Sequence, residues 1–181
     1  MFRFFRLLSI LVFLGVMAAG YTHRNGVSAL SLAPGSLPNA ALTPGAVVRA
    51  GVTTICRTGY SRSVRPTGET WYQLKRAAFL RYGYPRLISG LVGDHLVPIE
   101  IGGAPTDLRN IWPEALNDAL KKDVVEDAAR IAVCFHGYPL QQMQVRIAHD
   151  WRTAIPSNFP FTENERSYLQ RVSQRTGYGS D

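Results

Sequence analysis

The chain has 181 residues, 46% of them apolar, and a formal net charge of +7 at pH 7. This length gives room for one folded domain with a tail, and the apolar fraction favours a protein with a core over a disordered chain. The positive charge suits a polyanionic partner such as a nucleic acid, although basic proteins without such a partner are common.

The first residues have the pattern of an export signal. Arg3 and Arg6 precede an apolar stretch at residues 7–19, and small residues at 18–20 offer a site for signal peptidase. The stretch falls short of the ~20 apolar residues that a membrane span needs. We therefore expect residues 1–20 to be a signal peptide, with an uncleaved membrane anchor as the alternative, and the protein to be periplasmic or secreted.

The next segments predict a linker and the start of the domain. Residues 21–41 are rich in Gly, Ala, Ser and Pro and predict a flexible linker, so that the domain would occupy residues 42–181. The β-branched residues 53–56 predict a strand. Helical spacing predicts a helix over residues 68–84. It carries basic residues that we interpret as a solvated face, with phosphate contacts as the alternative: Lys75, Arg76 and Arg81.

The two cysteines, Cys56 and Cys134, form an even pair in a chain that we expect to be exported. A disulfide between them is the default in an oxidising compartment. The alternative is a thiolate metal site that includes His136, but the chain lacks the paired CxxC spacing typical of zinc sites.

Residues 91–114 combine the strongest strand and loop signals of the chain. Residues 91–101 and 108–112 predict two strands, and the Gly- and Pro-containing loop between them predicts a hairpin. Pro113 and Glu114 are residues favoured in the first turn of a helix, which we therefore expect to start there.

Three helical patterns follow the predicted hairpin. The first has an apolar stripe made of Leu116, Leu120, Val124, Ala128 and Ile131. The second covers residues 139–154. The third starts at Thr162, which forms a capping box with Glu165.

These elements carry sequence motifs that resemble a known family. The segments GDHLVPIEIGG, RNIWPE and KKD resemble the HNH branch of the His-Me finger, or ββα-metal, nucleases. More narrowly, TICRTGYSRSVRP, AVCFHG and IAHDW stand in the order found in exported bacterial members of that family. The resemblance implies an α+β fold in which a ββα-metal hairpin-plus-helix core is surrounded by additional helices, with one disulfide.

The resemblance also implies a metal-dependent endonuclease that hydrolyses phosphodiester bonds of DNA, RNA or both. His95 would be the general base, because an imidazole with a pKa near 6.5 can accept a proton from water at neutral pH. Asp94 would supply a hard oxygen ligand to a divalent ion, magnesium first, with manganese, calcium or zinc as alternatives. In a regular strand these neighbours point to opposite sides, so a twist or bulge is needed.

Two further residues complete the site that the resemblance implies. Asn110 would tie the loop together and help to orient the base. Asn117 is expected to face inward from the following helix and to complete the metal site, with Asp118 as the alternative ligand. Val92 stands where a carboxylate is expected in many relatives.

Basic residues near these motifs are the candidate contacts to substrate phosphates: Arg62, Arg65, Arg109 and Lys121. We expect a nucleic acid as the substrate and no stable protein partner. A non-catalytic ββα module that binds nucleic acid or a cell-envelope partner is the alternative function.

Overall fold

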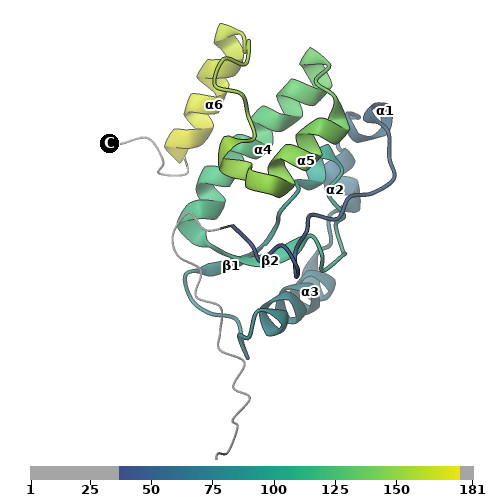
Figure 1. The fold of residues 1–181 in the computed structure, drawn as a ribbon, viewed down its shortest axis with the longest axis vertical. Helices are drawn as coiled ribbons and strands as arrows, with labels where there is room; N and C mark the ends of the chain where they lie inside the picture. Colours follow the sequence, from purple (N-terminus) through teal and green to yellow (C-terminus); the bar gives the residue numbers. More distant parts are fainter. Residues whose placement is uncertain (1–36, 176–181) are drawn as a thin grey trace, which may run out of the picture.

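The computed structural model describes residues 37–175, and the predicted export signal lies outside them. The described part is an α+β fold, in which a two-stranded antiparallel hairpin packs against helices (Figure 1). No helix within these residues combines the length and apolar character of a membrane span. In chain order the elements are α1 (Val52–Ile55), α2 (Tyr60–Val64), α3 (Gly68–Arg81), β1 (Leu91–His95), η1 (Ile99–Ile101), β2 (Ile111–Ala115), α4 (Leu116–His136), α5 (Leu140–Asp150), η2 (Trp151–Thr153) and α6 (Glu163–Arg175).

The hairpin lies between α3 and the helices that follow it in sequence (Figure 1). Asp94 pairs with Trp112 and His95 with Ile111, so the end of β1 meets the start of β2. The main apolar cluster joins the hairpin and its connecting loop to α4 and α5. Its members include Leu96, Val97, Ile101, Trp112, Met143 and Ile147. Leu37 and Leu42 also pack against this cluster, so the packed region includes Leu37, ahead of the predicted domain start.

The first strand is shorter than the sequence predicted. β1 ends at His95, and the chain then turns through η1 instead of continuing to Ile101. Gly102 adopts a left-handed conformation with φ of 82°. A Cβ atom on Gly103 would lie 1.8 Å from the carbonyl oxygen of Val97. The two glycines therefore permit a tight turn that a residue with a side chain would not allow.

The second strand continues through residues that were predicted to start a helix. β2 includes Pro113 and Glu114, and α4 begins only at Leu116, so the predicted helix start was wrong. Proline is tolerated because each strand of a two-stranded sheet is an edge strand. Glu114 is consequently a buried strand residue and does not lie in the first turn of a helix.

The predicted strand at residues 53–56 is instead the short helix α1, which ends at Ile55 with Cys56 as its C-cap. Ile55 is buried, and Cys56 forms a disulfide with Cys134 of α4, with a Cα–Cα distance of 5.5 Å. Tertiary contacts thus outweigh the β propensity of this segment. The disulfide prediction is confirmed, and the alternative metal site with His136 is wrong because neither cysteine is free.

The predicted apolar stripe of α4 is buried at Ala128 and Ile131, but the first turns of the helix differ from the prediction. Leu116 is 45% exposed, whereas Asp118 is 1% exposed and Lys122 is fully buried. The periodicity of apolar residues misplaced this face, because its first turns bury charged side chains that have partners elsewhere in the fold.

The last two predicted helices are present. The predicted helix over residues 139–154 is divided into α5 and η2 at Asp150, whose carboxylate accepts a hydrogen bond from the backbone N–H of Arg152. The capping box of α6 is confirmed. The N–H of Thr162 donates to the carboxylate of Glu165 at 2.8 Å, and the N–H of Glu165 donates to the hydroxyl of Thr162 at 3.3 Å.

Candidate active site on the hairpin

His95 lies at the end of β1 and is 3% exposed. Its Nε2 atom is 3.0 Å from the carbonyl oxygen of Pro105, in the loop between the strands. The indole of Trp71 from α3 stacks on the imidazole with ring centroids 5.2 Å apart and planes 12° apart. Burial lowers the pKa of His95 below its usual value, against the opposing effects of the Pro105 carbonyl and Asp94.

The contact with Pro105 determines which imidazole nitrogen carries the proton. A carbonyl oxygen only accepts hydrogen bonds, so Nε2 must be the donor. In the neutral ring Nδ1 then has a free lone pair, which is the atom that can accept a proton. The geometry and the protonation state of His95 therefore suit a general base.

Asn110 connects the loop to the strand end through three side-chain hydrogen bonds. Its Oδ1 accepts from the N–H of Val97 at 2.8 Å, and its Nδ2 donates to the carbonyl oxygens of Val97 at 2.9 Å and Ala104 at 3.2 Å. Asn110 is fully buried. Because Ala104 directly precedes Pro105, these bonds also hold the carbonyl that orients His95.

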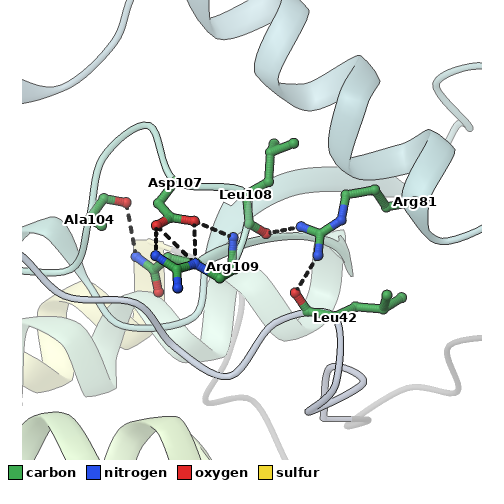
Figure 2. A network of polar contacts seen from close by, with 7 residues as sticks. Leu42, Arg81, Ala104, Asp107, Leu108 and Arg109 are labelled. Carbon is green, nitrogen blue, oxygen red and sulfur yellow. Dashed lines mark hydrogen bonds and ion pairs between the residues drawn. The ribbon is translucent and has the colours of Figure 1, made fainter.

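The outer side of the same loop is held by arginines (Figure 2). Arg81 of α3 donates to the carbonyl oxygen of Leu108 at 2.6 Å and to that of Leu42 at 2.8 Å. Arg109 forms a bidentate pair with Asp107, in which Nη2 donates to Oδ2 at 2.6 Å and Nε donates to Oδ1 at 3.1 Å. The sequence had suggested that Arg81 belongs to a solvated basic face. It instead connects α3 to two backbone carbonyls.

Asp94 belongs to a cluster of ionisable groups between the hairpin and α4. Its Oδ1 accepts from the N–H of His95 at 2.8 Å, and its Oδ2 lies 3.0 Å from Nζ of Lys122. Lys122 also contacts the carboxylate of Glu126, four residues further along α4. Glu114 is fully buried and lies next to Asp94, close enough for the two carboxyl groups to act on each other's pKa.

Burial and mutual interaction set the charge states of this cluster. Burial acts to raise the pKa of Asp94, but the Lys122 ammonium outweighs this effect and holds that pKa well below its usual range. Burial raises the pKa of Glu114, and the nearby Asp94 raises it further. Burial raises the pKa of Glu126 to about 7 despite the attraction of Lys122. The carboxylates hold the pKa of Lys122 well above its usual value, although its burial acts in the opposite direction.

The structure places the predicted helix ligands differently from the sequence. Asn117 is exposed, so its predicted inward orientation was wrong, and Asp118 is the buried neighbour. Helix α4 is therefore turned about its own axis relative to the prediction. Lys122 lies on its buried face, whereas Leu120 and Val124 are partly exposed. Asp118 lies 3.7 Å from Nζ of Lys121.

The four predicted phosphate contacts are dispersed. Arg65 is close enough to influence the pKa of His95 and shares the lining of a cavity with Glu126. Arg62 lines a separate cavity of about 580 Å³ that includes none of the motif residues Asp94, His95 or Asn110. Arg109 and Lys121 are each paired with an acidic residue. Of the four, Arg65 is the one whose charge acts on the pKa of His95.

Sequence reasoning missed several residues at this site. Trp71 lies in the helix predicted over residues 68–84, but its helical spacing did not indicate that it stacks on the imidazole. Lys122 and Glu126 have the i, i+4 spacing of a helix ion pair, which was a usable signal. Nothing in that spacing showed that the pair would be buried or would reach Asp94 across the fold.

The donor set agrees with a magnesium ion held by few protein groups. Magnesium takes carboxylate oxygens and needs only one or two of them, since water and substrate phosphate supply the rest. Asp94 offers such an oxygen, with 22% of its side chain accessible. The neighbouring Glu114 does not, because it is fully buried and its pKa is raised well above the usual value of a glutamic acid. Within residues 37–175 no group of three or more His, Cys, Asp or Glu side chains could hold a metal ion.

Comparison with known proteins gave no match. No family model matches the chain, and neither a curated protein nor a solved structure matches it. Its function has to be inferred from the site geometry and the motifs of the sequence.

Proposed function

We propose that this protein is an exported, metal-dependent endonuclease of the HNH branch of the His-Me finger nucleases. The observation that supports this most directly is the hydrogen bond from Nε2 of His95 to the Pro105 carbonyl. It leaves Nδ1 as a proton acceptor next to Asp94, on a hairpin that is followed by a helix. A buried, oriented imidazole beside a carboxylate suits metal-assisted phosphodiester hydrolysis, with the imidazole as general base and the carboxylate as metal ligand.

In the proposed reaction His95 accepts a proton from a water molecule at Nδ1. The water oxygen forms a bond to phosphorus while the bond from phosphorus to the leaving oxygen breaks, and that oxygen takes up a proton. Asn110 holds the loop that orients the imidazole. Asp94 would hold a divalent ion, which supplies positive charge to the phosphate in the transition state.

Basic side chains near His95 suit a polyanionic substrate. Arg65 is exposed and acts electrostatically on the imidazole. Nζ of Lys75 lies 5.9 Å from the centre of the Trp71 ring, which stacks on His95. We propose that Arg65 and Lys75 contact phosphates on either side of the cleaved bond. Both DNA and RNA carry the charge that these residues would recognise.

Export is proposed from the N-terminal pattern and is supported by the disulfide. A Cys56–Cys134 bond is typical of a periplasmic or secreted protein.

A second function, a non-catalytic module that binds nucleic acid or an envelope partner, is favoured by two observations. Lys122 already neutralises Asp94, and the predicted helix ligand Asn117 is exposed. A protein that only binds would need neither a metal ion nor an unprotonated Nδ1.

The deciding experiment incubates the oxidised, full-length protein with supercoiled plasmid and with RNA, with magnesium or with EDTA. We expect cleavage that requires magnesium. A His95→Ala preparation, purified in parallel, controls for contaminating nucleases. Retention of intact plasmid in a gel-shift assay, without cleavage under any metal condition, would favour the binding module instead.

A further inference from the structure

Lys122 is a fully buried lysine on α4 whose ammonium group contacts three acceptors. These are Oδ2 of Asp94 at 3.0 Å, the main-chain carbonyl oxygen of His95 at 2.6 Å and the carboxylate of Glu126. An ammonium group has three N–H donors, so its hydrogen-bonding capacity is fully used.

The acceptors of Lys122 connect it to the candidate active site. Burying an ammonium group is costly unless it is paired and hydrogen-bonded. Glu126 alone could neutralise the charge from the same helix. Lys122 instead also binds the side chain of Asp94 and the backbone of His95, the two neighbouring residues to which the proposed nuclease assigns the metal and the base.

These contacts explain how two adjacent strand residues can serve one site. Side chains of neighbouring residues normally point to opposite faces of a strand. Here the carboxylate of Asp94 turns back, so that Oδ1 accepts from the N–H of His95 at 2.8 Å while Oδ2 binds Lys122. Lys122 also donates to the carbonyl oxygen of His95, so that both the N–H and the carbonyl of this residue are held. The ammonium thus fixes the carboxylate and the main chain of the base together.

We propose that Lys122 is a positioning residue, which fixes the Asp94 carboxylate and the His95 main chain in the orientation needed for catalysis without contacting the substrate. This inference rests on the proposed nuclease function, because the roles of Asp94 and His95 come from it. It assigns the orientation of the site to a side chain of α4.

Two variants test the role of Lys122. Lys122→Met removes the ammonium while retaining a similar volume, but it leaves Asp94 and Glu126 unpaired and can prevent folding. The double variant Lys122→Met/Glu126→Gln removes both partners of the helix pair and is expected to fold. Gln144→Met is the matched control, because Gln144 is also a buried donor to a backbone carbonyl, that of Ile101.

Two measurements are made on each folded variant. The first is cleavage kinetics at saturating magnesium, which separates kcat from KM for DNA. The second is the pair of imidazole ¹⁵N chemical shifts of His95, which reports the tautomer and needs no activity. We expect the double variant to lose about 10- to 100-fold in kcat, as for other partners that orient a ligand, with KM within about twofold. We also expect its His95 to lose the pure Nε2–H signature, because a displaced His95 main chain would break the contact of Nε2 with the Pro105 carbonyl.

The outcomes separate the two proposals. Wild-type kcat and an unchanged His95 tautomer in a folded double variant would overturn the positioning role, as would equal losses in Gln144→Met. If the wild-type protein cleaves no nucleic acid, the nuclease proposal fails. The ¹⁵N shifts then still decide whether Lys122 orients His95: a changed tautomer in the double variant supports the positioning contact, and an unchanged one refutes it.

Discussion

Nε2 of His95 lies 3.0 Å from the carbonyl oxygen of Pro105, across the loop that joins the two strands. The partner carbonyl follows Ala104, whose own carbonyl oxygen accepts a hydrogen bond from Asn110 at 3.2 Å. The end of β1, the loop and the residue before β2 therefore depend on one another. Together these contacts keep Nδ1 of the neutral His95 ring unprotonated.

Replacing the base should abolish most of the activity. We expect His95→Ala to lower the rate of plasmid cleavage by at least ~10²-fold, the usual contribution of a general base. Single-turnover cleavage measures this, with circular dichroism to show that the fold is retained. The control is His149→Ala, at an exposed histidine of α5, which should cleave at the wild-type rate. Unchanged cleavage by His95→Ala would remove this residue from the mechanism.

The pH dependence of cleavage should follow the lowered pKa of His95. A general base acts only in its neutral form, and burial holds the pKa of this group below 6.5. The neutral form is therefore already dominant at pH 6.5 and is lost as the pH falls further. We expect kcat/KM to be constant at neutral pH and to decline on the acidic side of 6.5. A decline that begins well above pH 6.5 would contradict the assignment.

Asn110→Ala should destabilise the fold and reduce cleavage together. The substitution leaves the N–H and carbonyl of Val97 and the carbonyl of Ala104 without their partner. Each buried unsatisfied group costs about 1–3 kcal/mol, so the three groups together predict a loss of about 3 kcal/mol or more in the free energy of unfolding. Urea denaturation measures it. The exposed Asn158→Ala is the control and should change stability by less than about 0.5 kcal/mol.

Removing the disulfide should lower stability without affecting the site directly. The bond joins residues separated by 78 positions, for which the chain-entropy estimate is about 4–5 kcal/mol. We expect the double variant Cys56→Ala/Cys134→Ala to unfold at a lower urea concentration than the oxidised wild type. Adding a reductant should destabilise the wild type and leave the double variant unchanged. Two titratable thiols in oxidised native protein would count decisively against the bond.

Metal dependence can identify the ligands. EDTA should abolish cleavage, and Asp94→Ala should raise the magnesium concentration needed for half-maximal activity more than Asn117→Ala does, because it removes a full charge. Asp118→Ala completes the comparison, since Asp118 is the buried residue of this pair. A metal defect in Asp118→Ala, but not in Asn117→Ala, would assign the helix ligand to Asp118. Cleavage that is insensitive to EDTA would refute the metal-dependent mechanism.

The local features of this protein could be predicted from its sequence. The hairpin over residues 91–115 follows from two β-rich segments around a Gly-Gly loop, although its strand ends were misplaced. Thr162 and Glu165 predicted the start of α6 because a capping box involves only residues three apart. Cys56 and Cys134 predicted a disulfide, because an even cysteine pair in an exported chain is normally oxidised.

The sequence also determined which residues of the motif could act together, and tertiary packing determined their environment. Asp94, His95 and Asn110 are close because one short hairpin contains them. That α4 buries Asp118 and Lys122 instead of Leu116 could not be read from periodicity, which assumes that the apolar face is the buried one. In α4 the assumption fails, because the ion pair with Asp94 of β1 allows Lys122 to be buried. An ammonium can be buried once Asp94, the His95 carbonyl and Glu126 are assembled around it, and only the folded chain brings these groups together.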